Sequence, residues 1–391
     1  MKFEFYTAAR ILFGRGEFGR VGELARQHGQ RALLVGGGEH LEASGAWQQL
    51  IAACEQQDVV VTDYRVAGEP EIESIDVALE VAHASGCDQV IALGGGSALD
   101  TGKAVAGLMT HDGGVLDYME VIGKGQPLTR AAAPFIAIPT TAGTGTEVTK
   151  NAVIADKSRG FKASMRSPLL VPKVALIDPA LTDSMPPEVT ASTGLDALTQ
   201  LIEPYVSCKA HPLTDGIALT GIRLAAEALP RAYRDPTDRL ARDQMALAAL
   251  MGGICLANAG LGAVHGFAAP LGASFPVPHG VACAALLPHV MRANVRALRE
   301  RDPQSPALGK YAQVGELLAG LARGTEGAAD AGVEWVERLV IELTIPGLGR
   351  YGMQQSDVDA LAAGAQRASS MKGNPLVLTE DELRGCVRAA L

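Results

Sequence analysis

The sequence predicts an α/β domain built on a parallel sheet, followed by a domain made almost entirely of helices. Three observations support this fold class. In the first half, short apolar runs alternate with segments whose apolar residues recur with the helical period. Two of these runs lead directly into turns rich in small residues, as buried strands do at one edge of a parallel sheet. Beyond Pro179, Pro186 and Pro187, nearly the whole chain has helical spacing.

Four apolar or β-branched runs are expected to be strands, and three segments around them are expected to be helices. The strands are 31–35, 59–64, 88–93 and 135–138, and the helices are 17–28, 41–57 and 72–85. Such an alternation forms right-handed βαβ units, which bring the ends of the strands to one edge. Residues 2–6 alternate polar and apolar side chains, which predicts a strand with residues 10–14 as its hairpin partner.

The change of pattern places a domain boundary near residues 180–187. We expect residues 1–182 to form the α/β domain and residues 183–391 to form the all-helical domain. A chain of 391 residues, of which 48% are hydrophobic, is long enough to build both around large cores.

Charge and composition exclude several classes of protein. The formal charge is −9 and no basic stripe stands out, so nucleic acid is not an expected partner. The six cysteines form no CxxC pair and are expected to be reduced core residues. The N-terminus has no signal-peptide core, and no uncharged run reaches the roughly 20 residues that span a bilayer. A soluble, cytoplasmic protein without a membrane partner is expected.

The motif GGGSALDTGK at residues 94–103 begins directly after the strand 88–93. A glycine-rich turn that opens a helix presents free backbone N–H groups, which suits a pyrophosphate. Ser97 can cap the helix or bind the phosphate, while Asp100 and Lys103 could pair with each other or act near the ligand. The alternative is a tight turn that needs glycine for its backbone alone. The motif matches neither GxGxxG nor a P-loop.

The segment PTTAGTGTEVT at residues 139–149 follows the strand 135–138. Its five threonines and two glycines offer hydroxyls and backbone amides with little bulk. A threonine-rich turn with a helix cap is the alternative, but its place at the same sheet edge favours contact with a ligand.

A candidate metal site lies in the second half of the chain. Asp196 and Gln200 are four residues apart and so share one helix face, and His265 and His279 each precede a glycine. One carboxylate and two imidazoles form a divalent-metal site of the catalytic kind, with a coordination position left open. Each residue alone could instead be structural: Asp196 as a helix cap, and each histidine as a satisfied core residue.

Together these motifs resemble the iron-containing (group III) alcohol dehydrogenases, within the superfamily of glycerol dehydrogenase and dehydroquinate synthase. The resemblance rests on GGGSALDTGK, PTTAGTGTE, Gly194-Leu-Asp-Ala197, the two His-Gly pairs and MKGNP at 371–375, and it covers nearly the whole chain. It implies a Rossmann-like NAD(P)-binding domain, a helical metal domain with the active site in the cleft between them, and a homodimer.

The resemblance also implies roles for individual residues. The metal positions are Asp196, Gln200, His265 and His279. The cofactor-binding residues are Gly37, Gly38, Gly95, Gly96, Ser97, Asp100, Thr140, Thr141, Thr144, Thr149, Asn151 and Lys162. No general base is obvious; His289 is a candidate, and Glu203, on the helix face of Asp196, is expected to support the metal ligands.

Three positions depart from the family pattern. Many members carry His at the position where this chain has Gln200. The amide oxygen of Gln200 could bind the metal, bind a metal-held water, or do neither. The loss of a histidine ligand shifts the expected metal from Fe(II) toward Zn(II). A second His that lines the substrate side in relatives is Ala269 here. NAD-preferring relatives often have Asp near Gly37; without that carboxylate NADP as well as NAD can be accepted, unless Glu39 excludes the 2′-phosphate.

The expected function is therefore hydride transfer between NAD(P)(H) and a small alcohol, aldehyde or ketone, assisted by one divalent metal, Fe(II) or Zn(II). Two alternatives remain: a metal-independent enzyme similar to maleylacetate reductase, and a non-catalytic nucleotide-binding protein on the same fold. A lyase similar to dehydroquinate synthase would need a more basic phosphate pocket than the sequence offers.

Overall fold

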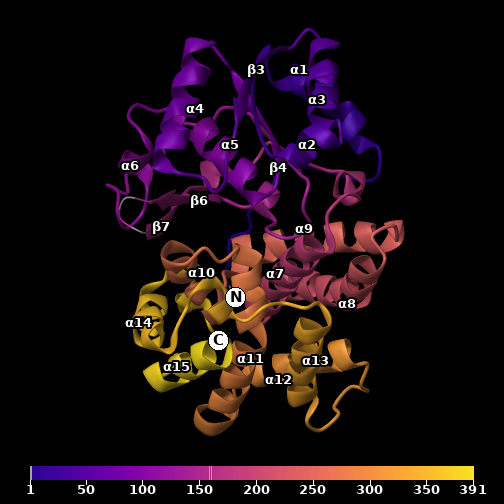
Figure 1. Cartoon of the computed structure of the whole chain (residues 1–391), viewed down its shortest axis with the longest axis vertical. Helices are drawn as coiled ribbons and strands as arrows, with labels where there is room; N and C mark the ends of the chain where they lie inside the picture. The colour runs from indigo at the N-terminus through magenta and orange to yellow at the C-terminus, as the bar shows by residue number, and fades with distance from the viewer. Residues whose placement is uncertain (1, 158, 160) are drawn as a thin grey trace. The chain divides into compact units, whose positions relative to one another are not determined.

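The computed structural model describes residues 2–157, 159 and 161–391, which form two compact units. The sheet unit consists of Phe5–Thr141 and Gly145–Ser184. The helical unit consists of Met185–Leu391, joined by Ala142–Thr144 and by the N-terminal residues up to Glu4. Figure 1 traces the chain from one unit to the other by colour.

The sheet unit is built on six parallel strands in the order β1-β8-β5-β4-β2-β3. The strands are β1 (Arg10–Phe13), β2 (Arg31–Gly36), β3 (Val60–Arg65), β4 (Gln89–Gly94), β5 (Phe135–Pro139) and β8 (Val174–Ile177). The predicted α/β class with a parallel sheet is confirmed. From β2 the chain runs outward to the edge strand β3 and then returns to β4 on the other side of β2. The sheet therefore reverses its winding between β2 and β4, where ligands bind in folds of this kind.

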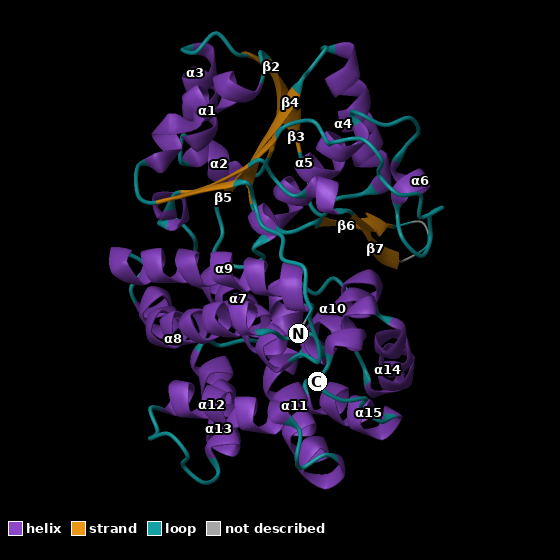
Figure 2. Ribbon diagram, turned by 180° about the vertical axis from the view of Figure 1, so that it is seen from behind, coloured by secondary structure: helices purple, strands orange, loops and turns teal. Residues whose placement is uncertain are grey.

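Helices cover both faces of this sheet, as Figure 2 shows. Along β2, Leu33 and Val35 face a core formed with α4 (Ile72–Ala84) and α5 (Gly96–Leu108). Leu34 faces the opposite core, formed with α1 (Val21–His28) and α3 (Ala46–Glu55). Because the strand is buried on both faces, its sequence reads as a continuous apolar run rather than as an alternation.

Two local predictions were wrong, and one element was not anticipated. Residues 2–6 form no strand in the described chain. Strand β1, which was expected to form a hairpin with residues 2–6, pairs in parallel with β8 instead. The helix expected over 41–57 is divided into α2 (Glu39–Ala43) and α3, because Gly45 adopts a left-handed φ of 74° between them. An antiparallel hairpin of β6 (Asn151–Asp156) and β7 (Phe161–Arg166) was not anticipated.

The helical unit contains nine longer helices among the residues that the structure describes. They are α7 (Pro187–Val206), α8 (Pro212–Arg234), α9 (Arg239–Ala259), α10 (Ala263–Ser274), α11 (His279–Arg301), α12 (Pro306–Ala319), α13 (Ala328–Glu342), α14 (Val358–Arg367) and α15 (Glu380–Ala389). They enclose one large core. Helix α9 is long and apolar enough to cross a membrane, but 61% of its most apolar window is buried inside the protein, as in the core helix of a soluble protein.

Candidate active site

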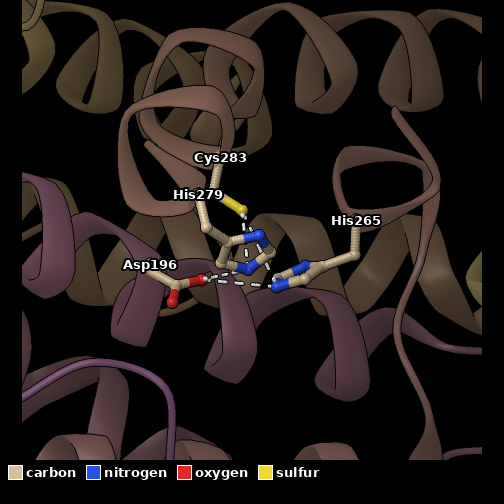
Figure 3. Close-up of side chains that lie close together, drawn as sticks. All are labelled: Asp196, His265, His279 and Cys283. Atoms are coloured by element: carbon tan, nitrogen blue, oxygen red, sulfur yellow. Dashed lines mark hydrogen bonds and ion pairs between the residues drawn. The ribbon is translucent and has the colours of Figure 1, made fainter. Parts of the chain in front are cut away.

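Four side chains from three helices of the helical unit converge on one point. Asp196 comes from α7, His265 from α10, and His279 and Cys283 from α11. One ligand atom of each lies within 4.8 Å of all the others. Figure 3 shows the carboxylate, the two imidazoles and the thiol pointing toward one another.

Helical spacing and the small size of Gly280 bring these side chains together. Asp196 and Glu203 lie seven residues apart on one face of α7, with Gln200 between them. A Cβ atom at Gly280 would stand 2.6 Å from the carbonyl oxygen of Ser192, so the first turn of α11 can lie against α7 only because residue 280 is glycine. The glycine after His279 is thus required by packing.

The carboxylate of Asp196 is buried and faces both imidazoles. Its Oδ1 lies 3.3 Å from Nε2 of His265 and 3.8 Å from Nε2 of His279. Within the described structure this buried oxygen has no hydrogen-bond partner of suitable geometry. A buried, unpartnered carboxylate oxygen is costly unless a cation takes up its charge.

Glu203 fixes the orientation of His265. Its Oε2 lies 2.7 Å from Nδ1 of His265, and its Oε1 accepts a 2.7 Å hydrogen bond from the backbone N–H of Val264. When Nδ1 carries the proton and donates it to Glu203, the lone pair of Nε2 points toward Asp196. This is the arrangement that carboxylates impose on metal-binding histidines.

Electrostatics couple the members of the cluster. Electrostatic interaction with Cys283, and then with Asp196, raises the pKa of His279 to about 9, against the effect of burial. Burial lowers the pKa of His265, but Cys283, Asp196 and Glu203 outweigh it and raise that pKa well above 6.5. Burial raises the pKa of Asp196, yet His279, His265 and a hydrogen bond from Gln200 give a net lowering. The carboxylate and the two imidazoles thus interact strongly, and each favours the charged form of the other.

This donor set fits a divalent metal ion. Carboxylate oxygen and imidazole nitrogen bind zinc and iron, and thiolate sulfur favours zinc. Oδ1 of Asp196 and Nε2 of His265 face the same point, 3.3 Å from each other. The side chain of His279 is 44% exposed, so one side of the cluster is open to a small molecule.

Three other positions singled out by the sequence lie around or away from this cluster. Gln200 is buried beside Asp196, and its Oε1 has no hydrogen-bond partner among the described residues. His289 follows His279 by about 15 Å along α11. Glu337 and Arg292 are the charged groups that act on the pKa of His289, which burial lowers. Ala269 is half-buried on α10.

In the sheet unit, the glycine-rich motif lies where the sequence places it, at the carboxyl ends of β4 and β5. Gly94 pairs with Pro139, and Thr140 N–H donates to the carbonyl of Gly94. Helix α5 begins at Gly96, so its first N–H groups face this edge of the sheet. A Cβ atom at Gly95 would stand 3.5 Å from Thr141, which brings the two loops together as the walls of one cradle.

The neighbouring turn after β2 excludes a side chain. A Cβ atom at Gly37 would stand 2.2 Å from the carbonyl oxygen of Val66, whereas Gly38 is exposed and has a φ of 98°. An aspartate at Gly37 therefore cannot be accommodated with this backbone. The side chain of Glu39 lies outside what the structure describes.

The remaining predicted cofactor residues surround the unexpected hairpin. Asp100 and Lys103 both bind it: Asp100 accepts a hydrogen bond from the N–H of Val153, and Lys103 Nζ donates to Thr149 Oγ1 and to the carbonyl of Asn151. Lys162, on β7, lies 2.6 Å from a carboxylate oxygen of Glu69. Thr144 belongs to the short segment that clusters with the helical unit.

Sequence reasoning missed Cys283. The signal was present, because Cys283 follows His279 by four residues and so lies on the same face of a helix. The absence of a CxxC pair directed attention away from it. All six cysteines are free thiols.

A parallel sheet with a glycine-rich turn that opens a helix at its carboxyl edge, together with a helical unit that carries a cluster of metal-binding groups, is typical of a metal-dependent dehydrogenase. Comparison with known proteins identifies which kind. The sequence pattern of the iron-containing alcohol dehydrogenases matches residues 8–179, and that of the C-terminal part of the same family matches residues 190–391.

Individual relatives agree over their full length. Alcohol dehydrogenase 4 of Schizosaccharomyces pombe is 34% identical over 389 residues, which are 99% of this chain and 89% of the relative. The crystal structure of a 1,3-propanediol oxidoreductase superposes with a TM-score of 0.92 at 32% identity, covering 100% of both chains. The structure of sulfoacetaldehyde reductase from Bifidobacterium kashiwanohense in complex with NAD⁺ superposes with a TM-score of 0.86 at 29% identity, covering 100% of this chain and 99% of that one.

The chain belongs to the iron-containing alcohol dehydrogenase family. It is an oxidoreductase that interconverts alcohols and their carbonyl products with a metal and a nicotinamide cofactor.

Proposed function

We propose that Asp196, His265 and His279 hold the catalytic metal and that the cradle at residues 94–97 and 139–141 holds the pyrophosphate of the cofactor. The convergence of two imidazoles on the orphaned Oδ1 of Asp196 carries the first assignment. When bound, a divalent ion supplies Lewis-acid polarisation of the alcohol or carbonyl oxygen, and the nicotinamide carries the hydride.

The residues of the chain contribute positioning and charge. Asp196 offers the negative charge that retains the cation. Glu203 keeps the proton of His265 on Nδ1, so that Nε2 remains a lone-pair donor. The N–H groups at the start of α5 are directed at an anion, and the helix dipole reinforces them. Thr140, Thr141 and Thr144 supply small polar groups for the rest of the cofactor, and Asn151 and Lys162 do so from the hairpin.

We further propose that the enzyme accepts NADP(H) as well as NAD(H). Gly37 has no room for the carboxylate that repels a 2′-phosphate. Arg65 pairs with Gly36 at the end of β3, and its guanidinium lies 4.1 Å from the ring centre of Trp47. Its ion pairs with Asp63 and Glu42 are exposed contacts, which a phosphate can displace.

The oligomeric state and the location of the protein belong to the same proposal. A homodimer is supported by the N-terminal segment, in which Phe3 and Phe5 are 45% and 37% exposed. A soluble, cytoplasmic enzyme with a small-molecule alcohol or aldehyde as substrate, and with no nucleic-acid or membrane partner, is supported by the acidic composition and the free thiols.

The test is an assay with a panel of alcohols, aldehydes and keto acids, each with NAD(H) and NADP(H). We expect Asp196→Ala to lower kcat/KM by about 100-fold or more, because the metal is lost. Asp359→Ala, an exposed change on α14, is the matched control and leaves activity intact. Absence of turnover by the wild-type protein across the panel would overturn the proposal in favour of a non-catalytic nucleotide-binding role.

A further inference from the structure

Cys283 is the one member of the cluster that neither the sequence motifs nor the proposed function uses. Its thiol is buried, and it lies one helical turn after His279 on α11. Sγ is 3.7 Å from Nε2 of His265 and 3.7 Å from Nε2 of His279. Figure 3 shows the sulfur directed at the same point as the two rings and Asp196.

These separations suit ligands of one ion better than a hydrogen-bonded group. Both ring nitrogens lie at the same distance from Sγ, and this distance is long for a hydrogen bond of a thiol, which is a weak donor and a weak acceptor. Around a tetrahedral zinc, the usual bond lengths place N and O ligand atoms about 3.3 Å apart and N and S about 3.6 Å apart. The N···O separations here are 3.3 and 3.8 Å, and both N···S separations are 3.7 Å.

We propose that Cys283 is a fourth protein ligand of the metal, together with Asp196, His265 and His279, and that its thiolate makes the site prefer Zn(II) to Fe(II). The inference rests on the proposed metal site and deepens it. A soft sulfur ligand selects zinc among the metals that carboxylate and imidazole also bind. The exposed side of His279 leaves room for a substrate oxygen as an additional ligand.

Cys283 also accounts for Gln200 at a position where many relatives have a histidine. An amide oxygen is a weak ligand, so Gln200 by itself leaves the site one strong donor short. The thiol reaches the cluster from α11, whereas Gln200 is carried by α7. Gln200 then acts on the carboxylate of Asp196 rather than on the ion.

Cobalt(II) substitution gives a readout that does not depend on activity. The purified enzyme is stripped of metal, loaded with Co(II) and examined by absorption spectroscopy. We expect visible d–d bands and, in the near ultraviolet, a thiolate-to-cobalt charge-transfer band. Cys283→Ser should abolish the charge-transfer band, whereas Cys255→Ser, which changes a buried thiol on α9 that contacts the carbonyl of Thr214, should retain it.

Competition between Zn(II) and Fe(II) under anaerobic conditions tests the selectivity. The Zn:Fe ratio in the loaded wild type should fall by about tenfold or more in Cys283→Ser, because the soft donor is lost. Even if Cys283→Ser folds poorly, the presence or absence of the charge-transfer band in the wild type shows whether a thiolate binds the metal.

The outcomes separate the two claims. In one outcome, Co(II) binds and gives d–d bands that Asp196→Ala removes, but no charge-transfer band appears. Cys283 is then not a ligand, and only this inference fails. If the wild type binds neither Co(II) nor Zn(II) yet reduces substrate at full rate, the proposed metal site fails and this inference falls with it.

Discussion

Glu203 and His265 form a short contact, with Oε2 of the carboxylate 2.7 Å from Nδ1 of the imidazole. Glu203 also accepts from the N–H of Val264, so both of its oxygens are directed at the first turn of α10. One side chain on α7 thus sets the position of α10 and the tautomer of its histidine.

Replacing Glu203 by Gln should weaken metal binding. The amide keeps the shape, but one of its ends is a donor and must face either Nδ1–H or the N–H of Val264. We expect metal affinity to fall by about 10- to 100-fold, as for other residues that orient metal ligands. Competition with a chromophoric chelator measures this, and Glu227→Gln on α8 is the control. An unchanged affinity would show that Glu203 only supports the fold.

Replacing Gln200 by His should tighten metal binding, because an imidazole at this position can add a ligand that the Gln200 amide does not supply. The measurement is the rate at which a chelator removes the metal, which should be slower in Gln200→His. Gln366→His, an exposed change on α14, should leave the rate unchanged. If both variants release metal at the wild-type rate, residue 200 lies outside the coordination sphere.

Lys103 should be a major contributor to the stability of the sheet unit. Its buried Nζ donates to the carbonyl of Thr146, to Thr149 Oγ1 and to the carbonyl of Asn151, at 2.8, 2.7 and 2.9 Å. Lys103→Met removes three buried hydrogen bonds from a charged donor and should cost about 3 kcal/mol or more in the free energy of unfolding. Denaturant titration checks this. Lys124→Met, which removes a surface ion pair with Asp117, should leave the midpoint unchanged.

Glu147 should make stability depend on pH. Burial raises its pKa from 4.5 to about 7 in the folded protein. Between these values the folded state retains a proton that the unfolded chain has lost, so stability falls as pH rises through this window. Glu147→Gln removes the titration. The stability of the wild type relative to this variant should therefore fall by about 3 kcal/mol between pH 4.5 and 7; a constant difference would contradict the assignment.

The central sheet was predictable because its strands are buried on both faces. Runs such as residues 32–35 and 135–138 are uniformly apolar and lead into glycine- or threonine-rich turns. The hairpin of β6 and β7 was not predictable in the same way. Five of its twelve strand residues are polar. It is held by Asp100 and Lys103, whose side chains bond to it across about 50 residues of sequence. The wrong hairpin at the N-terminus has a similar cause, since β1 pairs with β8, more than 160 residues away.

For the candidate site, helix spacing placed Asp196, Gln200 and Glu203 on one face, and the structure agrees. Spacing alone could not show that α10 and α11 bring His265 and His279 to that face; the resemblance to a family supplied this. Cys283 was overlooked although it obeys the same four-residue rule relative to His279. Asp100 and Lys103 were expected to pair or to act near the ligand, and each bonds instead to the hairpin.

The most direct test of the account is the metal dependence of turnover. The purified enzyme is analysed for bound metal, stripped with a chelator, and assayed with NAD(P)H and an aldehyde before and after metal is restored. The site of Asp196, His265 and His279 predicts about one divalent ion per chain, loss of activity when it is removed, and recovery with Zn(II) or Fe(II). Full activity in a metal-free preparation would contradict it and would favour a metal-independent reductase on the same fold.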